Sequence, residues 1–381
     1  MEKNKTNLNV PHLRFPEFSG EWEMCKVKDF TKVVAGATPS TSNKEYWGGD
    51  IRWMNSGELN LKRVYEVQGR ITQLGYEKTS TKIVPPQSVL IGLAGQGKTR
   101  GTAAINYIEL CTNQSIASIL PSDKYYPEFL YQNIESRYKE LRDISSGDGG
   151  RGGLNLQMIY NLNIPYCSIS EQRKIGDFLC LLDQRIETQK KIIEKYESLI
   201  RGIYHSLFNK PSSILQLREV VSVVKGKQVN GEELLEGGKY YVMNGGIEPS
   251  GYLDEYNTPA NTISISEGGN SCGYVQYNTE PFWSGGHCYS LLQKDDGINY
   301  QYLYHFLKYM ERDIMALRIG SGLPNVQKKD LERFEIRVLP IKQQNRVAEI
   351  LDDVSAKCSL EKQILQRWQC QKSFLLSNFF I

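Results

Sequence analysis

Ser168-Ile-Ser-Glu-Gln-Arg-Lys-Ile-Gly-Asp-Phe-Leu179 realigns, without a gap, on Pro340-Ile-Lys-Gln-Gln-Asn-Arg-Val-Ala-Glu-Ile-Leu351. The shift that carries position 168 to position 340 persists to the C-terminus. A period of this length is too long for a solenoid repeat, whose units span about 20–50 residues. The chain therefore contains a duplicated domain and a duplicated helix. Such a duplication suggests a ligand with two similar halves, of which DNA is the common example.

Each copy of this stretch opens a long amphipathic helix. Apolar residues recur at alternating steps of four and three, which is the seam of a coiled coil. Each helix is expected to extend for about 37 residues, or about 55 Å at 1.5 Å per residue. Both seams are interrupted by a polar residue at the same step, Gln189 and Glu361, so the two copies share their register. The first seam consists of Ile175, Leu179, Leu182, Ile186, Gln189, Ile193, Tyr196, Ile200, Ile203 and Leu207, and the second of Val347, Leu351, Val354, Cys358, Glu361, Leu365, Trp368, Lys372, Leu375 and Phe379.

The segments before the two helices, which we call heads, repeat more loosely. Lys26–Gly36 matches Gln216–Gly226, so position 36 corresponds to position 226. This shift is larger than the one that relates the helices, and the second head is therefore shorter than the first. Ser88–Ile91 also matches Thr262–Ile265, while the stretches that separate the matching segments within each head differ in sequence and length. A shared scaffold with divergent loops is how one fold recognises two different targets.

Composition indicates a globular protein of the cytoplasm with two or three domains. Hydrophobic residues make up 40% of the 381 residues, which is enough to build real cores, and charged residues make up 23%. The net charge of +3 is a weak sign of nucleic-acid binding, so any binding must come from local patches. The eight cysteines form no CxxC pair, which argues against a disulfide framework or a zinc site. The polar N-terminus and the lack of a long apolar run predict no membrane segment.

One motif has the pattern of a nucleotide-binding loop, but its surroundings argue against that function. Gly92-Leu-Ala-Gly-Gln-Gly-Lys-Thr99 satisfies the P-loop pattern, which requires a strand before it and a helix after it. The residues from Arg100 to Ile108 are instead β-branched and aromatic after an early glycine, which predicts a second strand and therefore a hairpin loop. The matching loop of the second head, Glu267–Gly273, has lost the lysine. A P-loop nucleotide-binding protein stays open as an alternative.

No catalytic or metal-binding set stands out. The chain lacks a methyltransferase motif of the Asn/Asp-Pro-Pro-Tyr/Phe type, and its four histidines do not cluster. The heads do contain side chains suited to reading bases, since Arg and Lys pair with guanine and Asn and Gln with adenine. The candidate DNA-binding residues are Arg52, Asn55, Gln96, Lys98, Arg100 and Arg151 in the first head, with Trp47 and Ser56 beside them, and Lys225, Lys227, Asn244, Asn270 and His287 in the second, with Asn230 beside them.

The whole chain resembles the specificity subunits of type I restriction–modification systems. The resemblance rests on the opening Pro11–Trp22, the turn Gly36-Ala-Thr-Pro39 and the loop Gly95–Gly101. Its most specific part is Ile164-Pro165 followed by Ser170-Glu-Gln-Arg-Lys-Ile175, which opens a long helix after the first head. The second copy departs from this pattern, with Gln343-Gln-Asn-Arg346 in place of Glu-Gln-Arg-Lys, but keeps the helix and the register.

The resemblance implies an α/β fold with two target-recognition domains separated by two long antiparallel coiled-coil helices. The implied segments are an arm (1–20), a first domain (21–168), a first helix (169–209), a second domain (210–339) and a second helix (340–381). Each domain would read one half of a split site in double-stranded DNA. The helices would measure the unread spacer, about sixteen base pairs for 55 Å at 3.4 Å each.

The resemblance also implies partners for a chain that is itself non-catalytic and binds no cofactor. Two modification (methyltransferase) subunits would carry S-adenosylmethionine, and restriction subunits would use ATP and Mg²⁺. The helix residues implied in docking them, or in the coiled coil, are Ile175, Leu179, Leu182, Ile186, Ile193, Val347, Leu351, Val354, Leu365 and Trp368. A coiled-coil scaffold without a nucleic-acid role is the remaining alternative.

Overall fold

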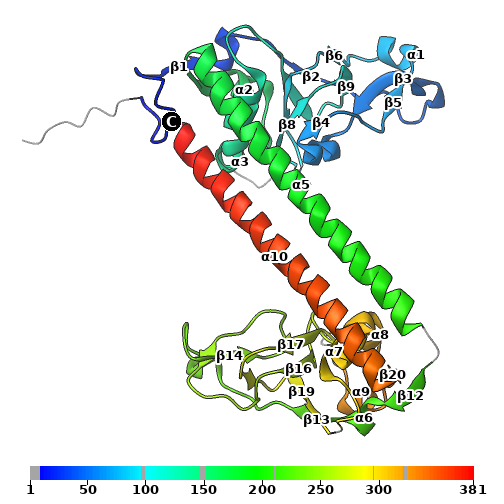
Figure 1. The fold of residues 1–381 in the computed structure, drawn as a ribbon. Coiled ribbons are helices and arrows are strands. Elements are labelled where there is room, and N and C mark those ends of the chain that lie inside the picture. The colour runs from blue at the N-terminus through cyan, green and yellow to red at the C-terminus, as the bar shows by residue number, and fades with distance from the viewer. Residues whose placement is uncertain are drawn as a thin grey trace, which may run out of the picture. The chain divides into compact units, whose positions relative to one another are not determined.

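The computed structural model describes residues 9–95, 99–145, 152–209, 212–294, 296–320, 322 and 324–381. The chain forms two compact units, of which unit 1 comprises Met1–Gln189 and Ile364–Ile381 and unit 2 comprises Lys190–Gln363. The two long helices, α5 (Ile169–Phe208) and α10 (Ile341–Phe379), each contribute one part to either unit (Figure 1). The segment boundaries expected from the sequence, which treat each helix as a separate segment, stay predictions.

Unit 1 contains the first head, built on two small sheets and a two-stranded ribbon. The first sheet has the order β2 (Val33–Ala35), β10 (Ile116–Ile119), β7 (Val89–Gly92), β8 (Ala103–Asn106) and β4 (Arg63–Val64). The second has the order β5 (Arg70–Ile71), β3 (Trp47–Met54), β9 (Leu110–Thr112) and β6 (Ile83–Val84). The ribbon pairs β1 (Glu23–Lys26) with β11 (Asn163–Tyr166).

Unit 2 contains the second head, which has the same plan. Its first sheet has the order β13 (Val221–Lys225), β19 (Cys288–Gln293), β16 (Thr262–Ser266) and β17 (Val275–Asn278). Its second has the order β15 (Tyr252–Leu253), β14 (Tyr240–Met243) and β18 (Trp283–Ser284). The ribbon pairs β12 (Ser213–Gln216) with β20 (Glu335–Val338).

The two heads correspond strand for strand. The order β2-β10-β7-β8 in unit 1 becomes β13-β19-β16-β17 in unit 2, and the parallel pair β3–β9 becomes the parallel pair β14–β18. Strand β4 adds a fifth strand to the first sheet of unit 1, and β6 a fourth to its second sheet, which accounts for part of the greater length of the first head. The predicted α/β class and the internal duplication are confirmed.

Short helices cover the sheets in both heads. In unit 1, α2 packs on β7 and β8, and in unit 2, α7 packs on β17. Many of the buried sheet residues are β-branched, such as Val89, Ile91 and Ile263, as suits strands covered on a face. The short helices are α1 (Gln73–Glu77), α2 (Pro127–Ser136), α3 (Tyr138–Ile144) and α4 (Leu156–Tyr160) in unit 1, and α6 (Leu217–Val220), α7 (Tyr300–Tyr309), α8 (Glu311–Ala316) and α9 (Lys328–Glu332) in unit 2.

The repeated glycine of the sequence marks a close approach of two backbones. A Cβ atom at Gly36 would lie 1.8 Å from the carbonyl oxygen of Thr112. At the equivalent Gly226 it would lie 2.2 Å from the carbonyl oxygen of Gly285. Any side chain would push the loop off the sheet in either head, so only glycine fits at both places.

The long helices contribute to the core of each unit. In unit 1 the start of α5 packs against the end of α10, where Leu179 and Leu182 belong to the same cluster as Leu375 and Phe379. In unit 2 the end of α5 and the start of α10 meet the head, and Phe208 shares a cluster with Leu351. Each head is therefore held by segments of both helices rather than by the one that follows it in sequence.

The N-terminal segment belongs to the core of unit 1. Trp22 is 2% exposed, and the ring of Phe15 stacks on that of Phe379 with centroids 5.5 Å apart. The N–H of Leu13 donates to the carbonyl of Asn378 at 2.9 Å, and Arg14 forms an ion pair of 2.7 Å with Glu171. The described part of the expected arm thus joins the start of α5 to the end of α10.

Candidate nucleic-acid interface

Strand ends in the second head bring several predicted DNA-reading residues together. Lys225 is the last residue of β13, Asn244 follows β14, and His287 precedes β19. The side-chain oxygen of Asn244 accepts a hydrogen bond of 3.1 Å from the N–H of His287, which fixes the two loops against each other. Lys227 lies two residues beyond Lys225 and is exposed, as is Asn270 in the loop after β16.

A buried acid that the sequence analysis did not single out lies at the centre of this group. Glu267, the first residue after β16, is 8% exposed. Its Oε1 atom lies 2.7 Å from Nζ of Lys225 and accepts a hydrogen bond of 2.9 Å from the hydroxyl of Tyr289. Its Oε2 atom faces Nδ1 of His287 at 3.7 Å and is buried without a hydrogen-bond partner among the described residues. We call these four residues the Glu267 cluster.

The Glu267 cluster exposes its nitrogen-bearing side chains and buries its carboxylate. The side chains of Lys225 and His287 are 53% and 60% exposed, whereas that of Glu267 is 10% exposed. Burial and the hydrogen bond to Glu267 raise the pKa of Tyr289 well above its usual value, so this hydroxyl stays a donor. The cluster therefore presents hydrogen-bond donors on a rigid, buried support.

The first head uses part of its predicted set for its own structure. Arg52 pairs with Glu66 at 3.2 Å on the surface. The side-chain oxygen of Asn55 accepts a hydrogen bond of 2.8 Å from the N–H of Gly57, and thereby caps the 3₁₀ turn Ser56–Leu61. Both residues lie in or next to the second sheet, whereas Arg100 follows β7 of the first. Their contact with DNA stays a prediction.

Three predicted residues of the first head, Gln96, Lys98 and Arg151, lie outside the described residues. Arg100, next to two of them, donates from its guanidinium to the carbonyl of Gly152. Its Nε atom is buried and has no hydrogen-bond partner within the described part of the chain.

The P-loop pattern is part of a β-hairpin. Strand β7 pairs antiparallel with β8, with Val89 opposite Ile105 and Ile91 opposite Ala103. Among the described residues, strand β8 and not a helix comes next in the chain after the loop, so the helix that a P-loop nucleotide site needs directly after it is replaced by a strand. The hairpin predicted from the sequence is confirmed.

Most seam residues predicted for the helices lie inside the chain's own cores. In the described structure Ile175, Leu179, Leu182, Ile186, Ile193, Val347 and Leu351 are buried, and Val354, Leu365 and Trp368 are half-buried. Their docking role stays a prediction. Because their side chains are largely covered, a partner protein reaching the helices would meet other residues first.

A buried glutamine anchors each long helix to its head, and the sequence analysis missed its role. The amide of Gln172 donates to the carbonyl of Cys167 at 2.9 Å and accepts from the N–H of Tyr126 at 2.8 Å. In unit 2 the amide of Gln344 donates to Leu339 at 2.7 Å and accepts from Asn299 at 2.8 Å. The sequence does hold a sign of this role, because Gln172 and Gln344 are identical although most residues around them differ between the two copies.

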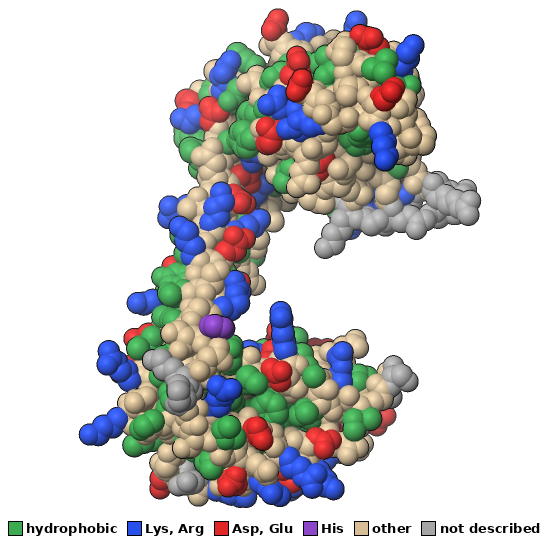
Figure 2. Space-filling view, turned by 90° about the vertical axis from the view of Figure 1, so that its right-hand side faces the viewer, with side chains coloured by type: hydrophobic (Ala, Val, Ile, Leu, Met, Phe, Trp, Pro, Cys, Tyr) green, Lys and Arg blue, Asp and Glu red, His purple; other side chains and the backbone are tan. Residues whose placement is uncertain are grey.

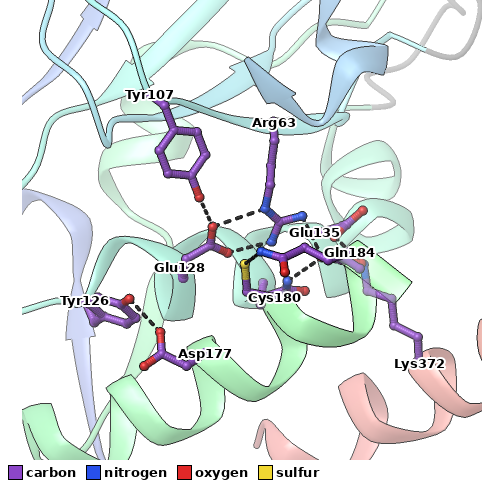
Figure 3. A network of polar contacts seen from close by, with 11 residues as sticks. Arg63, Tyr107, Tyr126, Glu128, Glu135, Asp177, Cys180, Gln184 and Lys372 are labelled. Carbon is purple, nitrogen blue, oxygen red and sulfur yellow. Dashed lines mark hydrogen bonds and ion pairs between the residues drawn. The ribbon is translucent and has the colours of Figure 1, made fainter. Parts of the chain in front are cut away.

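An ionic network in unit 1 joins the head to both helices (Figure 3). Arg63 of β4 contacts Glu128 of α2 at 2.7 Å and Asp183 of α5 at 2.8 Å. Lys372 of α10 contacts Asp183 at 2.7 Å and Glu135 of α2 at 2.8 Å. Burial alone would lower the pKa of Arg63, but Glu128 and Asp183 outweigh it and raise that pKa. The guanidinium of Arg63 thus stays charged.

Surface charge on the face shown in Figure 2 is mixed rather than of one sign. On the face shown in Figure 2, basic and acidic side chains alternate over both units. Among the described residues, no helix is both long and apolar enough to cross a membrane. Within the same ranges, no three His, Cys, Asp or Glu side chains are placed to hold a metal ion.

Comparison with known proteins places this geometry in a family. The family model for the type I restriction modification DNA specificity domain matches twice, over residues 19–198 and 209–367. The MjaIX type I restriction enzyme specificity subunit of Methanocaldococcus jannaschii is 26% identical over 366 residues, covering 84% of this chain and 83% of the relative.

Two solved structures share the fold. The type I restriction–modification S subunit of M. genitalium has a TM-score of 0.75 at 20% identity and covers 98% of this chain and 99% of its own. A chain from a structure that concerns assembly and conformational transition of the type I R-M system has a TM-score of 0.53 at 15% identity, covering 96% and 98%.

Proposed function

Because this chain belongs to the family of type I restriction–modification DNA specificity domains, we propose that each head reads one half of a bipartite DNA site. The chain is a recognition subunit and not the catalyst of the complex. The observation that carries the proposal is the strand-for-strand duplication of the heads, with a family match over each. Two copies of one scaffold with different strand-end side chains suit two different half-sites.

Reading would take place at the strand ends that hold the predicted residues. In unit 2 these ends carry Lys225, Asn244 and His287, held by mutual contacts and by Glu267. Side chains on rigid strand ends can discriminate between bases because their donors keep a fixed direction. The mixed charge on the face shown in Figure 2 suits a protein whose specificity comes from base contacts rather than from a broad basic field.

The catalytic groups would reside on partner subunits. Two modification subunits would bring S-adenosylmethionine and methylate a flipped-out adenine, and restriction subunits would bring ATP and Mg²⁺. Apolar residues at equivalent positions of the two helices support two identical partners. Phe178 of α5 is 39% exposed, and Ile350, which occupies the equivalent position of α10, is 40% exposed.

The central test reconstitutes activity from purified parts. The isolated chain should transfer no methyl group from S-adenosylmethionine, and addition of its modification subunit should create methylation at one split motif. Methyl transfer by the chain alone, or a complex that methylates without sequence preference, would contradict the proposal.

Stoichiometry tests the docking sites separately. Phe178→Glu and Ile350→Glu should each reduce the complex from two modification subunits to one, because each removes an apolar contact from one of two equivalent sites. The masses of the complexes, measured by analytical ultracentrifugation, report this directly. Ile83→Glu is the control, since Ile83 is equally exposed, at 41%, but lies in the first head.

A further inference from the structure

The buried acid of the second head replaces a leucine of the first. The N–H of Glu267 donates to the carbonyl of His287 at 2.9 Å, and the N–H of Leu93 donates to that of Ser115 at 2.8 Å. Glu267 and Leu93 each follow the corresponding strand, β16 or β7, and each is 8% exposed. Backbone geometry and burial are therefore the same, and only the side chain has changed.

The neighbours of Glu267 have changed in the same way. Lys225 lies opposite Tyr289 in the pairing of β13 with β19. In the first head the same pairing places Ala35 opposite Ala117. The Glu267 cluster of unit 2 thus occupies four positions that in unit 1 carry two alanines, a serine and a leucine.

The scaffold itself does not require this charge. A buried carboxylate is costly unless it is paired, and the first head fills the same place with an apolar side chain. The benefit of Glu267 must therefore lie in the groups that it holds. It fixes the ammonium group of Lys225, the last residue of its strand, which is followed by Gly226, where the backbone is packed too tightly for a side chain.

The charge balance favours a base over a phosphate as the ligand of Lys225. The negative charge of Glu267 lies 2.7 Å from the ammonium and cancels most of its attraction for a polyanion. One of the three ammonium donors is used on Glu267, which leaves two with a fixed direction. Guanine presents two acceptors, O6 and N7, on its major-groove edge, which match two donors.

We propose that Lys225 reads a guanine in the half-site of the second head, and that Glu267 is the positioning residue that aims it. His287 covers the second carboxylate oxygen, and Tyr289 supports the first. This inference rests on the proposed function and adds to it one base class and the residue that recognises it.

The test maps the methylated motif of the complete complex with its modification subunit. Lys225→Ala and Glu267→Leu, the latter restoring the side chain of the first head, should relax the same single guanine of one half-site. Discrimination at that position should fall by about 10- to 100-fold, as for the loss of one good base contact. Glu267→Gln, which keeps an acceptor for the ammonium, should retain more of the discrimination than Glu267→Leu.

The other half-site serves as the internal control, because the first head is unchanged. If all three variants methylate the complete wild-type motif, the inference about Lys225 and Glu267 is wrong. The proposed function would still be supported, because the wild-type complex recognises a split motif. Weaker binding to every sequence, with the salt slope lowered by about one unit, would identify a phosphate contact and also overturn it. A wild-type complex that does not methylate a split motif would contradict the proposed function itself.

Discussion

The three identical residues of the repeated stretch lie in three different surroundings. Leu179 and Leu351 are both fully buried in their units and serve packing. Gln172 and Gln344 are also buried, at 0% and 1% exposure, and hold the backbone where helix and head meet. Ile169 and Ile341 are 42% exposed, so packing within the chain does not explain their identity.

The buried glutamines give a direct prediction of stability. Gln172→Ala in unit 1 and Gln344→Ala in unit 2 should each lower the free energy of unfolding by about 1–3 kcal/mol, because buried backbone groups lose their partners. Urea denaturation measures this. Gln184→Ala is the matched control on α5, where the side chain is exposed, and should change stability by less than about 0.5 kcal/mol. Equal effects at Gln172 and Gln184 would contradict the anchoring role.

At the scale of elements, the sequence predicts regular patterns well and polar contacts poorly. The seam of α5 and α10 follows from its period, and the hairpin at Gly92–Thr99 from the strand-like residues after it. Gly176 within α5 allows α2 to approach, since a Cβ there would lie 2.8 Å from the N atom of Phe129. Contacts such as those of Arg63 join residues far apart in the chain, and no local pattern encodes them.

The ionic network of unit 1 should contribute far more than a surface pair. Arg63→Ala removes the cation that pairs with the buried Glu128 and leaves Asp183 with Lys372 alone, and breaking a buried ion pair costs about 3–5 kcal/mol. Arg52→Ala removes an exposed pair and should cost less than about 1 kcal/mol. Thermal or urea unfolding of the two variants provides the comparison. Similar losses of stability in the two variants would show that the network does not stabilise the contact between head and helices.

Unit 2 uses a histidine where unit 1 uses a glutamine. Nε2 of His305 lies 2.8 Å from Asp352 of α10, and Nδ1 lies 3.0 Å from the hydroxyl of Tyr204 of α5. The corresponding Gln132 of α2 donates to Asp183 at 2.7 Å. Burial lowers the pKa of His305, against the opposing effect of Asp352, so the folded unit favours the neutral imidazole.

This difference predicts a pH-dependent stability of unit 2. Below the unfolded histidine pKa of about 6.5, the unfolded chain binds a proton that the folded unit resists. The free energy of unfolding should therefore fall as the pH falls below about 6.5, toward the lowered pKa of His305. His305→Gln should remove this contribution, as shown by urea denaturation under mildly acidic and mildly basic conditions. A variant with the wild-type pH dependence would exclude His305 as its source.

At the scale of the whole molecule, duplication lets one chain carry two independent specificities. The shared strand order keeps both heads foldable, while positions at strand ends vary freely, as Leu93 and Glu267 show. The sequence predicts this organisation because the repeat that relates Ser168–Leu179 to Pro340–Leu351 is visible without structure. It cannot single out Glu267, because the importance of that residue comes from Lys225 and Tyr289, which reach it only in the folded sheet.

The proposed role of the long helices as a ruler predicts the effect of lengthening them. A seven-residue insertion after Ile192 in α5 and another after Ile364 in α10 would keep the period of the seam, since the two positions are equivalent in the repeat. Each helix would grow by about 10 Å, or about three base pairs of DNA. The methylated motif should then keep both half-sites and gain about three unread base pairs between them. Replacing seven residues at the same places, without a change of length, should leave the spacer as it was. A new half-site with the old spacer would show that the helices do not set the distance.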